Sequence, residues 1–284
     1  MKQQLQSMIN KFLTDVKVFK SKNTYYDELK NLTFFKRFFD IMDPVLINYD
    51  LMLSYIEYLR NNFNNSNYTI KKKINSVNRM LEFNKIDKIP VGKMKYQKKS
   101  IEIFDIQEIE MIKSACTKFE RSKDEYYNLL DITLLNFIID TGCRITETTE
   151  LKSLNIDFDN NSCIIDVTKN YRNKTVYFTD HTKKLLLKLL KYNQEEYVFF
   201  NFRTGKNITR FYFYDLCRHL EQMTKIKINP HKFRHTFASK MIDVGCPLES
   251  VQKLLGHSDI KTTMLYIHLN QLKIKNDYFK YITK

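Results

Sequence analysis

INPHKFRHTFASKM, residues 228–241, is the most informative stretch of the chain. Asn229 is predicted to cap a helix, because its side-chain oxygen can accept from a free backbone N–H, and Pro230 suits the first helical position. His231 and Arg234 are three residues apart and therefore share one face of that helix. Free N–H groups and the helix dipole favour an anion at this end, so the stretch predicts an anion-facing helix.

Three other motifs surround this helix in the chain. TGCRITE, residues 141–147, ends an apolar helical stretch, and KNYRNKTVYF, residues 169–178, follows a run with strand character. LESVQKLLGHSDIKTTMLYIH occupies residues 248–268. Each motif alone is weak, and an isolated HxxR is common on protein surfaces, but the complete set in this order is highly specific.

The ordered set resembles the tyrosine recombinase family, which includes phage integrases and Xer-like recombinases. In that family the HxxR helix is followed by LGH and, nine residues later, by a tyrosine, which correspond here to His257 and Tyr266. The family's first arginine lies in GxRxxE, which corresponds to Arg144 and Glu147. The resemblance therefore implies a site-specific DNA recombinase, or integrase.

The family's catalytic lysine lies in the turn of a β-hairpin. Alignment with that turn favours Lys169 over Lys174, although the family's glycine-rich turn reads NYRN here. The catalytic residues that the resemblance implies are Arg144, Lys169, His231, Arg234, His257 and Tyr266. Glu147 is expected to support this set from behind.

Phosphodiester chemistry explains the choice of side chains. Two arginine forks can bind the non-bridging oxygens and stabilise the charge of the transition state. The resemblance implies that Tyr266 attacks phosphorus, leaving a 3′-phosphotyrosyl bond and a free 5′-hydroxyl. Lys169 would protonate the departing oxygen, His231 would assist as base or donor, and His257 would bind the phosphate. We expect no metal, because two arginines and a lysine supply the positive charge, and no ATP or other cofactor, because the phosphotyrosyl bond conserves the bond energy.

Composition is consistent with a nucleic-acid partner. The 284 residues include 47 Lys+Arg and 32 Asp+Glu, a net charge of +15, which favours a polyanion. The first 100 residues hold 19 basic and 9 acidic residues, so this smaller part carries +10 of the excess. A lysine-biased composition is the alternative explanation. Five cysteines without a CxxC pair indicate reduced thiols in a cytoplasmic protein, and neither a signal peptide nor a membrane span is expected.

Periodicity predicts a mainly α fold in two domains. Helical spacing of apolar residues runs through residues 1–88, and Pro90 and Gly92 then interrupt it. The pattern predicts a helical domain over residues 1–92 and a basic linker over 93–100, and the resemblance implies that this domain is the family's SAM-like core-site DNA-binding domain. An α-rich catalytic domain with a small antiparallel β-sheet is expected over 101–284.

Basic side chains outside the catalytic set are weaker candidates for DNA contacts, since a solvated surface explains each of them equally well. They lie on one helix of the first domain, in the linker, and on a helix whose family equivalent approaches the major groove. These candidates are Lys71, Lys72, Lys73, Arg79, Lys93, Lys95, Lys98, Lys99, Arg210 and Arg218.

The resemblance implies double-stranded DNA as the partner, a homotetramer on two DNA sites, and scope for an accessory directionality protein. Two alternatives stay open. One is a DNA-binding regulator on a recombinase scaffold that no longer cuts, against which the intact residue set argues. The other is a type IB topoisomerase-like enzyme, which the integrase-like organisation of the chain does not favour.

Overall fold

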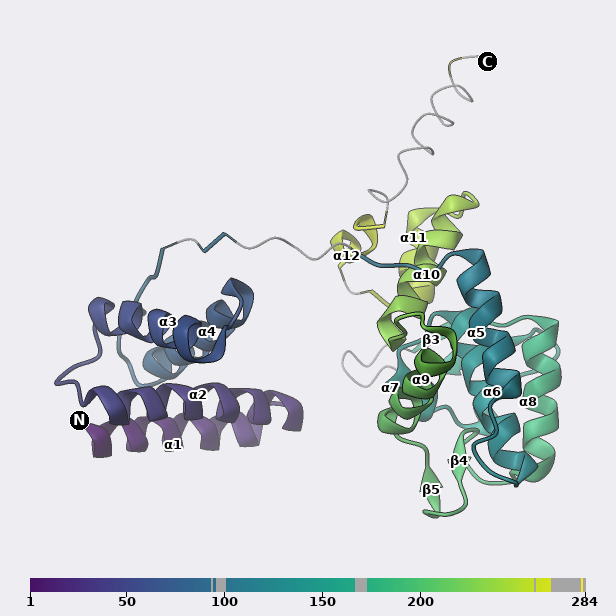
Figure 1. Ribbon diagram of the computed structural model, residues 1–284, viewed down its shortest axis with the longest axis horizontal. Coiled ribbons are helices and arrows are strands. Elements are labelled where there is room, and N and C mark those ends of the chain that lie inside the picture. The colour runs from purple at the N-terminus through teal and green to yellow at the C-terminus, as the bar shows by residue number, and fades with distance from the viewer. Residues whose placement is uncertain (93, 96–100, 167–172, 258, 267–281, 283–284) are drawn as a thin grey trace. The chain divides into compact units, whose positions relative to one another are not determined.

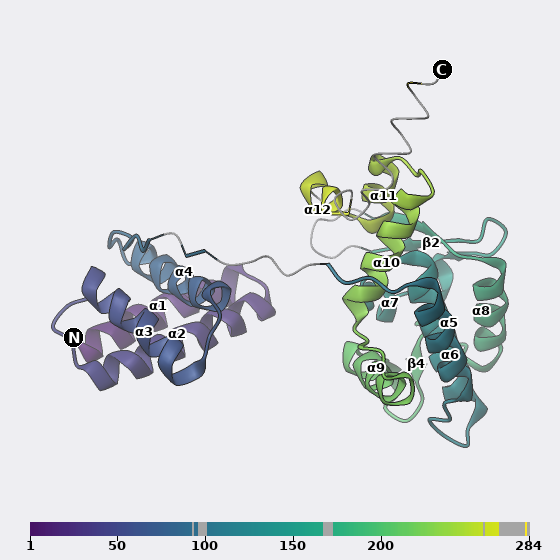
Figure 2. The same cartoon turned by 45° about the horizontal axis from the view of Figure 1, so that its top comes forward.

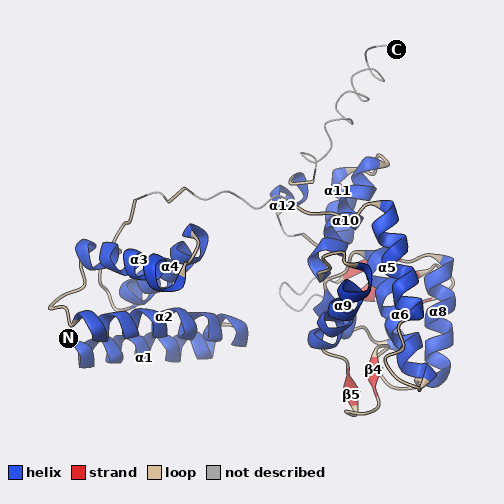
Figure 3. Ribbon diagram, in the orientation of Figure 1, coloured by secondary structure: helices blue, strands red, loops and turns tan. Residues whose placement is uncertain are grey.

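The computed structural model describes residues 1–92, 94–95, 101–166, 173–257, 259–266 and 282, and it divides into two compact units, Met1–Lys99 and Ser100–Lys284. Within the described residues, helices dominate both units and strands occur only in the second (Figure 3). The predicted mainly helical fold is confirmed. In the part of the chain that is described, no helix is long and apolar enough to span a membrane.

The first unit is a cluster of four helices. They are α1 (Lys2–Phe19), α2 (Lys22–Met42), α3 (Tyr49–Phe63) and α4 (Asn67–Phe83). Helix α2 lies alongside α1 and also packs against α4 (Figure 1). The side chains of Ser21, Asn48 and Ser66 cap α2, α3 and α4 by accepting from backbone N–H groups. One apolar face of each helix turns inward, and Phe35 and Tyr55 are fully buried between them.

The second unit combines eight α-helices with short strands in its described residues. The helices are α5 (Ile106–Lys118), α6 (Glu125–Thr141), α7 (Ile145–Thr149), α8 (Asp180–Tyr192), α9 (Arg210–Thr224), α10 (Pro230–Asp243), α11 (Leu248–Leu255) and α12 (Ile260–Met264). The strands are β1 (Ile156–Asp157), β2 (Ser162–Ile165), β3 (Lys174–Tyr177), β4 (Phe200–Asn201) and β5 (Lys206–Asn207). A short 3-10 turn, Ser153–Asn155, precedes β1.

The predicted small antiparallel sheet is confirmed, with strand order β1-β2-β3. A tight turn with Asn161 in the left-handed region joins β1 to β2. Ile165 of β2 lies opposite Lys174 of β3, so residues 166–173 connect the two strands. Cys163 and Val176 face the core from this sheet. The sequence analysis did not anticipate the second sheet, the two-residue pair β4–β5.

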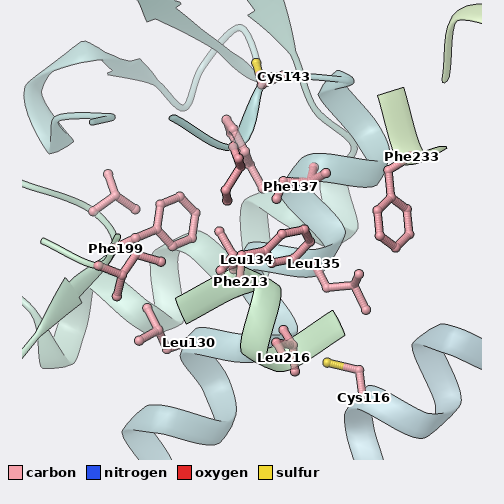
Figure 4. Packing of buried hydrophobic residues seen from close by; sticks show 14 of the residues in the cluster. Cys116, Leu130, Leu134, Leu135, Phe137, Cys143, Phe199, Phe213, Leu216 and Phe233 are labelled. Carbon is pink, nitrogen blue, oxygen red and sulfur yellow. The ribbon is translucent and has the colours of Figure 1, made fainter. Parts of the chain in front are cut away.

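Helix α6 forms the centre of the second unit. It is apolar on nearly all sides, as a helix surrounded by other elements must be, and α5, α8 and α10 pack around it (Figure 2). Figure 4 shows Leu134 and Phe137 of this helix among the buried side chains of α9 and α10, such as Phe213 and Phe233. This core fixes the end of α6 relative to the start of α10, where the motif residues lie.

We expect limited proteolysis of the DNA-free protein to cut within residues 93–99, which are rich in lysine. Each unit has its own buried core, so two stable fragments should result. Trypsin digestion followed by mass spectrometry would locate the cuts. Cleavage confined to the termini, or to sites within residues 101–284, would contradict the proposed division into domains 1–92 and 101–284.

Candidate active site

The helix that carries the HxxR motif begins as the sequence predicts. Asn229 caps α10, its side-chain oxygen accepting from Lys232 N at 2.9 Å, and Pro230 occupies the first turn. His231 lies exposed in this first turn, whereas Arg234, one turn further on, is only 4% exposed. The start of α10 therefore carries an exposed imidazole and a buried guanidinium on one face of the helix.

Arg234 is held by two backbone carbonyls that come from distant parts of the chain. Its guanidinium donates to the oxygen of Gly142 at 3.0 Å and to the oxygen of Leu255 at 2.6 Å. These carbonyls mark the ends of α6 and α11, so the arginine joins both helices to α10. A guanidinium has five N–H groups, so about three of them stay available for an anion.

Glu147 fixes the other arginine. Arg144 donates a hydrogen bond from its backbone N–H to one oxygen of this carboxylate at 3.0 Å and one from its guanidinium to the other oxygen at 2.7 Å.

Gly142, at the end of α6, has φ +60, and a Cβ there would lie 2.5 Å from Cδ1 of Phe237. Only glycine fits both constraints, which explains why the apolar helix can turn directly into the Arg144 segment.

Lys174 contacts two groups that hold the arginines, the carboxylate of Glu147 and the carbonyl of Leu255. Its ammonium donates to Glu147 at 2.8 Å and to the oxygen of Leu255 at 3.3 Å, and the residue is 7% exposed. Glu147 therefore holds Arg144 and Lys174, and the Leu255 carbonyl accepts from both Lys174 and Arg234. The other candidate lysine, Lys169, lies outside the described residues.

Tyr266 lies inside a small apolar cluster next to the HxxR helix. The residue is 3% exposed and packs with Ala238, Ile242, Val251 and Leu255. Its ring stacks on that of His257, with ring centroids 6.5 Å apart and planes at 10°. In turn, Nδ1 of His257 lies 2.9 Å from the hydroxyl of the buried Thr263, which fixes the orientation of the imidazole.

Electrostatic shifts show that the motif residues converge. Burial lowers the pKa values of His231, Arg234 and His257 and raises that of Tyr266, and in all four the positive charge of Arg144 acts towards a lower pKa. One arginine thus lies within electrostatic reach of all four. The structure therefore brings together every described residue of the motif set.

The charge state of the site follows from these shifts. Burial, reinforced by Arg234 and Arg144, lowers the pKa of His257 to about 4, so this imidazole is neutral at pH 7. Burial lowers the pKa of Arg234 only to about 10, so the guanidinium stays charged. Burial alone would raise the pKa of Glu147, but Lys174 and Arg144 outweigh it and the net shift is downward. The site thus keeps its positive charges on the arginines, where an oxyanion can bind.

Sequence reasoning missed one residue of this site, His235. Its Nδ1 lies 2.8 Å from the hydroxyl of Tyr266. The sequence signal was present, because His235 follows Arg234 directly and stands one helical turn after His231. The pairing with a residue 31 positions away required the tertiary structure.

Among the candidate DNA contacts of the first unit, Lys71 and Lys72 are exposed on α4. Lys73 is not: it is 4% exposed, and its ammonium lies 3.2 Å from the ring centroid of Phe34. Burial lowers its pKa to about 8, with a smaller effect of Lys30. The expectation of a surface contact from Lys73 is therefore wrong, because the helix turns this side chain into the core.

The remaining candidates are basic residues with varied surroundings. Arg79 is partly exposed but donates to Glu28 at 2.9 Å. Lys95 and Arg210 are exposed, and Arg218 is exposed beside its ion-pair partner Asp215. The candidates Lys93, Lys98 and Lys99 lie outside the described residues.

We expect Lys174→Met to lower the free energy of unfolding by about 3 kcal/mol, because it leaves the buried Glu147 without its ammonium partner. Equilibrium denaturation would measure this change. The matched control is Lys152→Met, which breaks the solvent-exposed ion pair with Glu196 and should have a negligible effect. Adding Glu147→Gln to Lys174→Met should restore part of the loss. Equal stability of the two single variants would contradict a linking role for Lys174.

Comparison with known proteins identifies the class of protein that this fold defines. A family model described as "Phage integrase family" matches residues 102–273, more than half of the chain. The chain belongs to this family, that of the tyrosine recombinases. It is therefore a tyrosine-type site-specific recombinase.

Individual relatives agree with this assignment. The chain is 33% identical over 217 residues to "Tyrosine recombinase XerA" of Saccharolobus solfataricus, covering 75% of this chain and 67% of that protein. It is 28% identical over 241 residues to a "Probable integrase/recombinase" of Acholeplasma phage L2, covering 82% and 81%.

Solved structures show the same fold at low sequence identity. XerH site-specific recombinase bound to its palindromic difH substrate has a TM-score of 0.79 at 18% identity, covering 98% of this chain and 84% of that one. The Tn1549 transposon integrase in complex with transposon right end DNA has a TM-score of 0.74 at 14% identity, covering 98% and 99%.

Proposed function

We propose that this recombinase cleaves and rejoins double-stranded DNA through a covalent 3′-phosphotyrosyl intermediate at Tyr266. The observation that carries the proposal is the position of the phenol, buried beside a neutral histidine and within electrostatic reach of Arg144 and Arg234. A phosphodiester needs both its charge neutralised and a nucleophile directed at phosphorus. The site combines these two elements.

In the proposed cleavage step, Arg144 and Arg234 bind the non-bridging oxygens of the scissile phosphate. The oxygen of Tyr266 forms a bond to phosphorus while the bond from phosphorus to the 5′-oxygen breaks. Rejoining is the reverse, with a 5′-hydroxyl as the nucleophile. One phosphoester bond replaces another in each step, so no external energy source is required.

Protons must leave the phenol and reach the 5′-oxygen. We propose that His231, in the first turn of α10, assists with the first as a base or hydrogen-bond donor, since partial burial of its ring, Arg234 and Arg144 lower its pKa and favour the neutral imidazole. Lys169 is the proposed acid for the second. The buried ion pair of Lys174 with Glu147 supports this choice, because the ammonium of Lys174 is already bound to the carboxylate that holds Arg144. His257 would donate a hydrogen bond to the phosphate.

DNA binding itself is proposed to use the basic surface. The net charge of +15 and the exposed Lys71, Lys72, Lys95, Arg210 and Arg218 support a partner that is a polyanion. The relatives named above include structures of recombinases in complex with DNA. We further propose assembly as a homotetramer on two DNA sites, as the resemblance to the family implies.

The test is detection of the covalent adduct. DNA flanking the protein's own gene would be footprinted to find the bound site, and a nicked substrate of that site would trap the intermediate. A band that resists SDS, forms in EDTA without ATP, and maps to Tyr266 by mass spectrometry is expected. Site-specific binding without any adduct would instead support a non-cleaving regulator, and relaxation of supercoiled DNA without recombination would support a topoisomerase-like activity.

A further inference from the structure

His235 contacts the hydroxyl group of Tyr266, the proposed nucleophile. Its Nδ1 lies 2.8 Å from the hydroxyl oxygen of Tyr266, and no role in the proposed chemistry has been given to it above. The imidazole comes from the second turn of α10, directly after Arg234. The half-buried ring and the buried phenol therefore form a contact between the HxxR helix and the segment that follows α12.

Among the described residues, His235 is the side chain that meets the phenol oxygen at hydrogen-bond distance. The ring of Tyr266 lies between two imidazoles, with its centroid 5.6 Å from that of His235 and 6.5 Å from that of His257. The buried side chains that pack with it, Ala238, Ile242, Val251 and Leu255, are aliphatic and cannot bond to the hydroxyl. A stacked ring in an apolar pocket can slide or pivot, whereas a hydrogen bond defines where the oxygen points.

The position of His235 places that oxygen beside the charged part of the site. His231 and His235 are one turn apart on the same face of α10, with ring centroids 6.4 Å apart. Arg234, between them in sequence, is held by the carbonyls of Gly142 and Leu255. A phenol bonded to His235 is therefore aligned with the same rigid helix that carries the phosphate-binding arginine.

The protonation state of His235 suits an acceptor. Burial, together with His231 and Arg234, lowers its pKa below the usual histidine range, which favours the neutral imidazole at pH 7. With its proton on Nε2, a neutral imidazole accepts a hydrogen bond at Nδ1. The phenol can then donate, which leaves the oxygen's lone pairs directed away from His235.

We propose that His235 is a positioning residue that holds the Tyr266 oxygen in its own protomer's site by accepting a hydrogen bond at Nδ1. This inference rests on the proposed function of Tyr266 as nucleophile. His235 acts through the phenol and does not contact the phosphate. A misplacement of the nucleophile by about 1 Å can cost roughly a hundredfold in rate, so the loss of this bond should be measurable.

Two amide substitutions separate the hydrogen bond from general polarity and packing. The oxygen of Asn in His235→Asn falls near the place of Nδ1, whereas the longer side chain in His235→Gln puts its polar end near the place of Nε2. We expect single-turnover cleavage of a nicked substrate at saturating protein to fall roughly tenfold to a hundredfold in His235→Gln. His235→Asn should remain within about fivefold of wild type, and both should bind the site with unchanged affinity.

The matched control is His219→Gln, at another half-buried histidine, which packs against Phe119 directly after α5. Its cleavage rate should be unchanged. Equal rates for wild type and His235→Gln, or equally slow rates for the Asn and Gln variants, would overturn the proposal. Faster cleavage by His235→Gln would also overturn it, since the contact would then restrain the nucleophile.

A second measurement does not depend on catalysis. With 3-fluorotyrosine at position 266, the ¹⁹F resonance of the DNA-free protein should shift in His235→Gln and return towards the wild-type position in His235→Asn. An unshifted resonance in both variants would overturn the contact. Were the wild-type protein to form no DNA adduct, the proposed function would fail, while this resonance would still decide whether His235 positions the phenol.

Discussion

Tyr266→Phe is expected to abolish the covalent DNA adduct while leaving site-specific binding intact. The substitution removes one oxygen and keeps the ring that packs with Val251 and Leu255 and stacks on His257. The structural cost is the hydrogen bond to His235, about 1 kcal/mol. The chemical cost is the nucleophile itself, so adduct formation should fall at least about 10⁴-fold, to below detection.

The matched control for this variant is Tyr126→Phe. Tyr126 is also 3% exposed, and its hydroxyl donates to the oxygen of Phe200 at 2.7 Å, away from the motif residues. It therefore loses a comparable buried hydrogen bond, but adduct formation should continue at the wild-type rate. Gel-shift binding and adduct yield on the same nicked substrate measure both effects. An adduct that persists in Tyr266→Phe would refute the assignment of the nucleophile.

Arg234→Ala is expected to reduce cleavage by at least about a thousandfold, because the phosphate loses the buried guanidinium that is proposed to bind its non-bridging oxygens. Stability should also fall, by about 2–4 kcal/mol, since the carbonyls of Gly142 and Leu255 each lose the hydrogen bond from this guanidinium and a cavity forms. Thermal unfolding would separate the second effect from the first.

Arg234→Lys distinguishes charge from geometry. A lysine keeps the positive charge but cannot reach both carbonyls and still offer a fork to phosphate, so cleavage should remain at least about a hundredfold below wild type. The matched control is Arg121→Lys, since Arg121 is a partly buried arginine, held by Asp131 and Asp215 outside the site. It should lose stability but, at saturating protein and below its melting temperature, cleave at close to the wild-type rate. Normal cleavage by Arg234→Lys would contradict the bidentate role.

Local features of the fold were predictable from the sequence. The cap at Asn229 is present as predicted, and the apolar helix ends at Gly142, within the predicted stretch 141–147. Each depends on interactions within a few residues of the chain, so the sequence alone contains the required information. The same holds for the shared face of His231 and Arg234, because helical geometry brings residues three apart together.

Through the resemblance to a family, the ordered motif set also indicated which distant residues lie close together. It placed Arg144, Arg234, His257 and Tyr266 in one site, and the structure brings them together. It could not choose between Lys169 and Lys174 on physical grounds. The burial of Lys174 between Glu147 and the Leu255 carbonyl depends on how α11, β3 and α7 pack together.

Tertiary structure alone decided the burial of Lys73 and the partner of His235. Lys71, Lys72 and Lys73 were all candidates for DNA contacts, but successive residues of a helix point in different directions, and Lys73 is the one that meets Phe34. His235 and Tyr266 are separated by two further helices, and no local rule sets the distance between them. Contacts of this kind depend on how complete helices pack, so a short-range pattern determines which side chains are present, and the packed core determines which of them touch.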